Sequence, residues 1–64
     1  MFAEERRAKI LEFLRRHKSM TVSELAKILN VSEPTIRRDL AFLESKRQII
    51  RTHGGSYSNR VPFL

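Results

Sequence analysis

Apolar residues recur at helical spacing through the first two thirds of the chain. Over residues 2–17 they fall on one side of a helix, and this side includes Ile10, Phe13 and Leu14. Charged residues occupy most of the other positions, so we expect a scaffold helix with one buried face. Arg6 falls close to that face and is therefore the basic residue of this helix that most needs a partner inside the protein.

A second helix is predicted over residues 21–29. At its start the Thr21 hydroxyl and the Glu24 carboxylate match a capping box, in which each accepts a hydrogen bond from a backbone N–H. Asn30 tolerates the left-handed conformation that ends a helix. The short link that follows has the spacing of a helix-turn-helix, predicted over residues 20–41. In that motif the second helix enters the major groove of DNA.

The third predicted helix, residues 33–46, begins after Ser32, a candidate N-cap. Ile36, Leu40 and Leu43 recur at i, i+4 and i+7 and form its buried stripe. The remaining face offers side chains that suit base edges, because arginine forks onto guanine, a threonine hydroxyl reaches a base or a phosphate, and proline or alanine meets a thymine methyl. The candidate base-reading residues are Glu33, Pro34, Thr35, Arg37, Arg38 and Ala41.

Structural roles remain open for several basic and polar residues. Arg37 and Arg38 also suit a solvated charged face, and the Thr35 hydroxyl can bond back to the backbone of the first helical turn. The basic run at residues 15–18 suits a solvated last turn that favours the helix dipole. Contact with DNA phosphates is the alternative for that run.

Asp39 stands out because DNA phosphates would repel a carboxylate on a helix that faces them. It lies at the edge of the buried stripe, as Arg6 does on the first helix. We therefore expect a structural salt bridge between Arg6 and Asp39 that locks the two helices together. Arg7 is expected to point outward.

The last part of the chain is predicted to form a wing at residues 49–58. Ile49 begins a strand, His53 and the two glycines after it suit a tight turn, and residues 56–58 suit a returning strand. A two-stranded hairpin of this size needs support from the helices, which Ile49 or Ile50 can supply.

The chain is strongly basic, and its positive charge is concentrated at the two ends. The net charge of +6 and isoelectric point near 10.9 suit an anionic partner such as nucleic acid. Residues 1–20 hold six basic and three acidic residues, residues 21–46 four of each, and residues 47–64 three basic and no acidic ones. The candidate phosphate and wing contacts are Arg16, Lys18, Ser23, Arg51 and His53, although a lone histidine at a turn can equally be just exposed.

Several classes of protein are not expected from this composition. Cysteine is absent and the two histidines are far apart, so we expect no disulfide, no metal site and no cofactor. The sequence lacks a long apolar run that would indicate a signal peptide or a membrane span, and a cytoplasmic location is expected. An enzyme is not expected either, because no nucleophile, base and orienting partner come together.

These residues resemble the N-terminal DNA-binding domain of the DeoR family of bacterial transcriptional regulators. The resemblance covers residues 4–56, including an Arg-x-His-Gly-Gly motif that begins at Arg51. Two positions depart from the family pattern, since members commonly have glycine at Arg47 and alanine at Ser56. A non-glycine residue in the left-handed region costs about 1 kcal/mol, so we expect Arg47 to end the third helix by another geometry or to shift the approach of the wing. The residues that match the pattern are Arg6, Ile10, Leu14, Ser32, Thr35, Ile36, Arg37, Arg38, Asp39 and Leu40.

The resemblance implies a three-helix winged helix-turn-helix at residues 1–58, mainly α with a small β-hairpin, that binds a double-stranded DNA operator. Family members join this domain to a C-terminal domain that senses a sugar phosphate and through which they form homo-oligomers. They often repress carbohydrate or nucleoside genes. Residues 59–64 would then begin a linker to such a domain, whose residues are not among these 64.

The main alternative is a winged-helix module that docks on another protein, with the positive charge incidental. Phe42, at the flank of the third helix and outside its buried stripe, is the residue that such a surface would use. RNA is a lesser alternative, because a helix presented for a B-form major groove does not suit the deep, narrow groove of A-form RNA.

Overall fold

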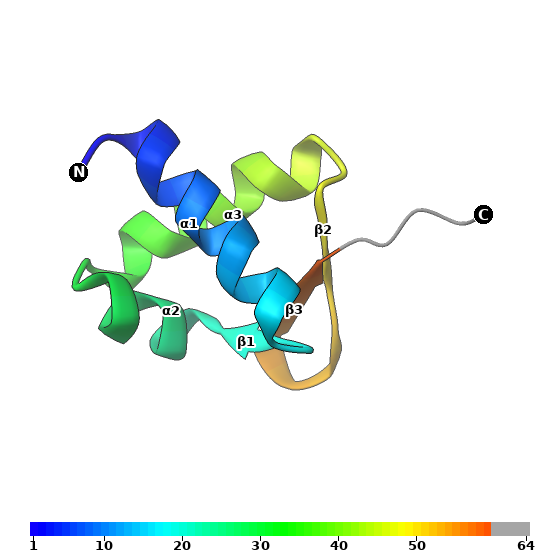
Figure 1. Ribbon diagram of the computed structural model, residues 1–64. Coiled ribbons are helices and arrows are strands. Elements are labelled where there is room, and N and C mark those ends of the chain that lie inside the picture. The colour runs from blue at the N-terminus through cyan, green and yellow to red at the C-terminus, as the bar shows by residue number, and fades with distance from the viewer. Residues whose placement is uncertain (60–64) are drawn as a thin grey trace.

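The computed structural model describes residues 1–59, which form three helices and a small antiparallel sheet (Figure 1). Figure 1 shows α1 crossing in front of α3, with the sheet at one end of the helices. The predicted fold class, a mainly helical winged helix-turn-helix, is confirmed. In chain order the elements are α1 (Ala3–Arg16), β1 (Met20–Thr21), α2 (Val22–Leu29), α3 (Glu33–Ser45), β2 (Ile49–Arg51), a 3-10 turn (His53–Gly55) and β3 (Ser56–Asn59).

The sheet has three strands in the order β1-β3-β2, and both pairs are antiparallel. The predicted hairpin is present as β2 and β3, and β1 adds a third strand that the sequence did not predict. Met20 pairs with Tyr57 and Thr21 with Ser56, so β3 is the central strand. The wing, which comprises β2, the 3-10 turn and β3, is thereby tied to the chain segment before α2. Of the predicted linker, residues 59–64, only Asn59 lies among the described residues, and it ends β3.

Side chains from all three helices and all three strands meet in one core. The stripe predicted on α3 is buried, which confirms that side of the helix as the inner one. Of the two isoleucines that could support the wing, Ile49 is 1% exposed and Ile50 is 45% exposed, so Ile49 faces the core. Among residues 1–59, none of the helices combines the length with the hydrophobicity that a membrane-spanning segment needs. The buried apolar residues are Ile10, Leu14, Met20, Leu25, Ala26, Leu29, Ile36, Leu40, Leu43, Ile49 and Tyr57.

Both helices of the helix-turn-helix begin at the predicted caps. The N–H of Glu24 donates to Thr21 Oγ1 over 3.1 Å, and the N–H of Thr21 donates to Glu24 Oε1 over 2.8 Å, which confirms the capping box. The N–H of Thr35 donates to Ser32 Oγ over 3.3 Å at the start of α3. At the end of α2, Asn30 has φ of 56°, the left-handed conformation that the sequence predicted. The starts of both helices and the end of α2 are therefore fixed by residues that suit these positions.

Arg47 takes the same left-handed conformation after α3, with φ of 60°. The N–H of Gln48 donates to the carbonyl of Leu43 over 3.0 Å, and the N–H of Arg47 to that of Glu44 over 2.9 Å. This pair of bonds is a Schellman motif, which satisfies carbonyls that the helix end would leave open. The expectation that Arg47 ends the helix by another geometry is therefore wrong, because these backbone bonds hold it where glycine commonly stands.

Replacing Arg47 with glycine is expected to stabilise the domain. Glycine removes the left-handed strain of about 1 kcal/mol but makes the unfolded chain more flexible, so we expect a net gain of roughly 0.5 kcal/mol. Urea denaturation of Arg47→Gly measures the change. Asn30→Gly is the matched control, and its free energy of unfolding should rise by less, since asparagine already tolerates this conformation. A loss of stability in Arg47→Gly would contradict the strain assigned to this residue.

Candidate nucleic-acid interface

The position of α3 depends on a buried carboxylate. Asp39 lies on the side of α3 that faces α1 and is fully buried. Arg6 donates from Nε to Oδ2 and from Nη2 to Oδ1, the second bond over 3.0 Å, so its guanidinium engages both carboxylate oxygens. The hydrogen bond to Asp39 raises the pKa of Arg6, although burial opposes this effect. The salt bridge predicted between these two residues is therefore present, and it joins α1 to α3.

Arg7 supplies a further hydrogen bond to the same carboxylate, from Nε to Asp39 Oδ1 over 3.3 Å. Its guanidinium carbon also lies 3.9 Å from the centre of the Phe42 ring, in a cation–π contact. The expectation that Arg7 points outward is wrong. On a helical wheel Arg7 is only about 60° from Ile10, and this was the signal in the sequence that would have placed it inward.

The exposed side of α3 lies between α1 and the wing. Asp39 marks the flank that faces α1. On the other flank Glu44 accepts a hydrogen bond from Arg51 Nε of β2 over 3.3 Å. The helical period places several exposed residues between these flanks, including Phe42 and Ser45. We call the four of them that were predicted to contact bases the reading face: Pro34, Arg37, Arg38 and Ala41.

The two arginines of the reading face have different surroundings. Arg37 Nη2 lies 3.0 Å from Oε1 of Glu33, which is one helical turn away. Arg38 is exposed and has no hydrogen-bond or ion-pair partner among residues 1–59. Its guanidinium is therefore free to fork onto two adjacent acceptors, such as guanine O6 and N7.

The Thr35 hydroxyl has a partner within the protein. Its Oγ1 lies 2.8 Å from Ser32 Oγ, the atom that caps α3. Thr35 is also half-buried, in contrast to the reading face. The sequence left open a bond from this hydroxyl to the backbone, whereas its partner is the Ser32 side chain, and the hydroxyl retains capacity for a second hydrogen bond.

The two wing residues predicted to contact DNA, Arg51 and His53, have different surroundings. Arg51 is paired with Glu44, and its guanidinium lies 5.6 Å from the centre of the Tyr57 ring. His53 is exposed at the tip, where the two following glycines have φ of 70° and 75°. Glycine adopts these angles without strain, so the chain can reverse tightly there. In Figure 1 the tip lies at the end of the hairpin remote from the end of α3.

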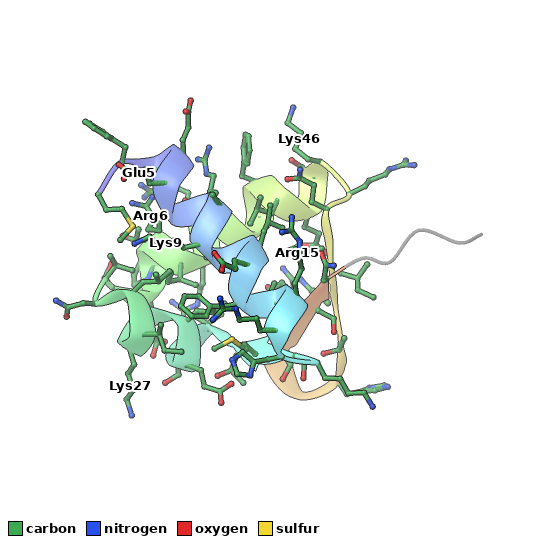
Figure 2. All side chains as sticks on the ribbon, viewed as in Figure 1. Glu5, Arg6, Lys9, Arg15, Lys27 and Lys46 are labelled. Carbon is green, nitrogen blue, oxygen red and sulfur yellow. The ribbon has the colours of Figure 1, made fainter. Side chains whose placement is uncertain are left out.

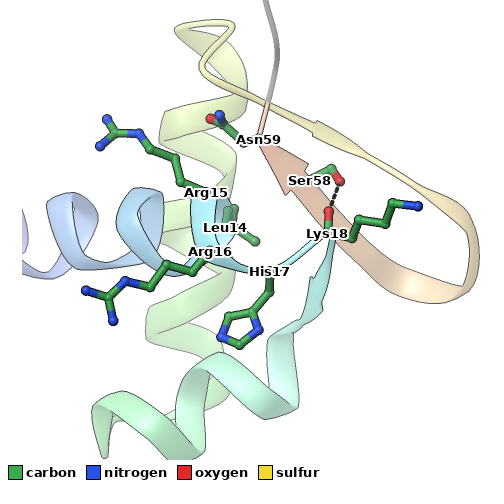
Figure 3. A pocket seen from close by; sticks show the side chains of 7 residues that line it. All are labelled: Leu14, Arg15, Arg16, His17, Lys18, Ser58 and Asn59. Atoms are coloured by element: carbon green, nitrogen blue, oxygen red, sulfur yellow. Dashed lines mark hydrogen bonds between the residues drawn. The ribbon is translucent and has the colours of Figure 1, made fainter.

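A pocket at the end of α1 is lined by the basic run of residues 15–18 together with Leu14, Ser58 and Asn59. Figure 3 shows the charged ends of Arg15, Arg16 and Lys18 pointing in different directions. Arg16 Nη2 is also paired with Glu12 Oε2 over 3.0 Å. These side chains do not converge on one anion, so each is available only as a separate phosphate contact.

The predicted site residues therefore form one coherent set and one dispersed set. The base-reading candidates share the first three turns of α3. In Figure 2, Lys27 on α2 and Lys46 after α3 point away from each other, so positive charge is spread over the molecule. The sequence did not assign Arg7 or Glu44 to the site, and the structure shows that they hold its two flanks. The phosphate candidates lie at the end of α1, the first turn of α2 and the wing: Arg16, Lys18, Ser23, Arg51 and His53, all exposed.

Comparison with known proteins supports one family. Residues 6–61 match the DeoR-like helix-turn-helix domain. The chain is 46% identical over 56 residues to the HTH-type transcriptional repressor GlcR of Bacillus subtilis, covering 88% of this chain and 22% of that protein. It is 44% identical over 52 residues to a putative galactitol utilization operon repressor of Escherichia coli, covering 81% of this chain and 46% of that protein. A lactose phosphotransferase system repressor of Streptococcus mutans is 38% identical to this chain over 61 residues, covering 95% of this chain and 24% of that protein.

These relatives are mostly several times longer than the matched segment, and the chain spans about a fifth of the length of GlcR. The similarity therefore concerns one domain of each relative. No solved structure matches the chain.

The contact between Arg6 and Asp39 is expected to contribute strongly to stability. In a double-mutant cycle with Arg6→Gln and Asp39→Asn, measured by urea denaturation at neutral pH, we expect a coupling of about 1–3 kcal/mol. Asp39→Asn alone should destabilise the domain because it leaves two arginines without their shared carboxylate. The matched control is the exposed pair Glu12 and Arg16, which should couple by about 0.5 kcal/mol or less. A coupling of zero for the buried pair would refute its role as a lock.

Proposed function

The chain belongs to the DeoR-like helix-turn-helix domain family, and we propose that it is the operator-binding domain of a transcriptional regulator, with α3 in the major groove. The observation that carries this proposal is the reading face, which is exposed, basic and held in place by the buried carboxylate of Asp39. DNA binding and transcription regulation are what the family and the relatives named as repressors support.

The reading face would contact bases, and the surrounding basic residues would contact phosphates. Arg38 would fork onto guanine, and Pro34 and Ala41 would meet thymine methyl groups. Glu33, Thr35 and Arg37 complete the base-reading set. Around them, phosphate contacts position the protein without reading sequence. We assign this role to Arg16, Lys18, Ser23, Arg51 and His53.

The wing would reach the backbone or minor groove beside the site that α3 reads. His53 lies at its exposed tip. Arg51 is held by Glu44 through an exposed ion pair, and such pairs are worth about 1 kcal/mol or less. A DNA phosphate can therefore replace the Glu44 carboxylate as the partner of Arg51 without a large cost in free energy.

The parent protein is proposed to be a repressor of sugar or nucleoside genes that responds to a sugar phosphate. Two relatives carry names that refer to galactitol utilization and to a lactose phosphotransferase system. Effector binding and homo-oligomer formation would belong to a C-terminal domain beyond these 64 residues, since the chain matches only part of each relative. We propose no enzymatic activity and no cofactor, and residues 1–59 hold no cluster of side chains suited to a metal ion.

The protein-docking alternative is less well supported. It relies on Phe42, which is 39% exposed. Arg7 lies over the Phe42 ring, and Lys46 Nζ is 5.5 Å from its centre. Two cations at the ring reduce the apolar surface that a protein partner would bury.

Arg38→Ala is expected to weaken binding to a duplex selected from a random pool by about 1–3 kcal/mol, with a smaller effect on random duplex. Fluorescence anisotropy across a range of salt concentrations measures both. Lys18→Ala is the comparison, because a phosphate contact should weaken binding to all sequences alike and lower the salt slope by about one. Equal losses on selected and random DNA for Arg38→Ala would contradict its assignment to bases.

The unmodified chain provides the wider test in the same assay. Binding of random duplex that weakens steeply as salt rises is expected, since phosphate contacts release counterions. Absence of binding at low salt would instead favour the protein-docking module.

A further inference from the structure

One exposed ion pair lies on α3, the helix that carries the reading face. Glu33 Oε1 and Arg37 Nη2 are 3.0 Å apart, and the side chains are 46% and 60% exposed. Glu12 and Arg16 on α1 form the same contact over the same distance, with 57% and 68% exposed. Exposed pairs of this kind add little to stability. What distinguishes Glu33 and Arg37 is that they occupy the first two turns of the helix that carries the reading face.

The pair also lies on the wing side of that helix. Spacings of four and then seven residues place Glu33, Arg37 and Glu44 along one side of α3. Glu44 contacts Arg51 of β2, which identifies this side as the one towards the wing. Arg38 and Ala41 lie further round the reading face, so the pair and Arg38 would meet different base pairs.

The donors and acceptors of the pair are complementary to one kind of base pair. Arginine has five N–H donors, and the bond to Glu33 uses one, so Arg37 can still fork onto two acceptors. In the major groove only guanine presents two adjacent acceptors, O6 and N7, while its partner cytosine presents the N4 amino donor. The Glu33 carboxylate accepts from such a donor.

We propose that Glu33 and Arg37 act as one unit that selects a G·C base pair, with Arg37 on guanine and Glu33 on the cytosine amino group. This inference rests on the proposed function and names a base pair that this site reads. Glu33 holds the Arg37 guanidinium in position before DNA arrives, which lowers the entropy lost on binding. Where adenine replaces guanine, the carboxylate faces thymine O4, an acceptor, and is repelled, so Glu33 also discriminates by repulsion.

The test compares single substitutions in the 64-residue chain. Duplexes are first selected from a random pool, and each base pair of the selected site is then replaced in turn while affinity is measured by fluorescence anisotropy. For the unmodified chain we expect that one G·C pair of the selected site is contacted by Glu33 and Arg37. Replacing that pair by A·T should weaken binding about tenfold, because both side chains lose their hydrogen-bond partners there. In Glu33→Gln, the penalty at that pair should fall to about twofold, while affinity for random duplex rises as the repulsive charge is lost.

Arg37→Lys keeps the charge but loses the planar fork, and it should reduce the preference at the same base pair. Glu12→Gln is the matched control because it removes one member of the equivalent pair on α1 and should leave every base preference unchanged. Far-ultraviolet circular dichroism verifies that each variant keeps its helix content.

The outcomes separate this inference from the proposed function. Preferences that are unchanged in Glu33→Gln would overturn the reading unit while leaving DNA binding intact, because Glu33 would then serve only the helix terminus. Loss of preference at different base pairs in Glu33→Gln and Arg37→Lys would also overturn it. Failure of the unmodified chain to bind or select duplex DNA would overturn the proposed function as well.

Discussion

The buried carboxylate of Asp39 is the constraint on which the arrangement of the domain depends. A carboxylate removed from water must be matched by donors, and Arg6 and Arg7 supply them from α1. Both arginines belong to the first turns of α1, so satisfying Asp39 fixes where that helix crosses α3. The crossing in turn sets which side of α3 stays exposed. The position of the reading face therefore depends on the salt bridge of Asp39 with α1, at the flank of the same helix.

The two flanks of α3 are held with different strength. Towards α1, the contact is buried, uses two arginines and continues through Arg7 onto the Phe42 ring. Towards the wing, the Glu44–Arg51 pair is exposed and screened by solvent. This difference suits a domain in which the recognition helix keeps its position while the wing adjusts to the backbone of the DNA. The pairing of β3 with β1 limits that adjustment, since it anchors the wing to the segment before α2.

Much of this structure could be predicted from the sequence where periodicity and local chemistry agree. The apolar stripe of α3, the capping box of α2 and the Arg6–Asp39 pair all followed from helical spacing. The strand β1 did not, because two residues are too few to show alternation and their partners lie far along the chain. Arg47 was misjudged because the gain from the two backbone bonds that hold its left-handed conformation cannot be read from its residue type. The base-reading and phosphate assignments remain predictions.

The central claim is that the reading face and the wing tip meet DNA while the first turns of α1 hold α3 in place. Amide chemical-shift changes in 1H–15N spectra, followed as selected duplex is added to labelled protein, test it most directly. The account predicts the largest changes at residues 33–41 and 52–55 and small changes at residues 10–14. Changes centred on Phe42 and the first turn of α1, with the amides of the reading face unmoved, would contradict it.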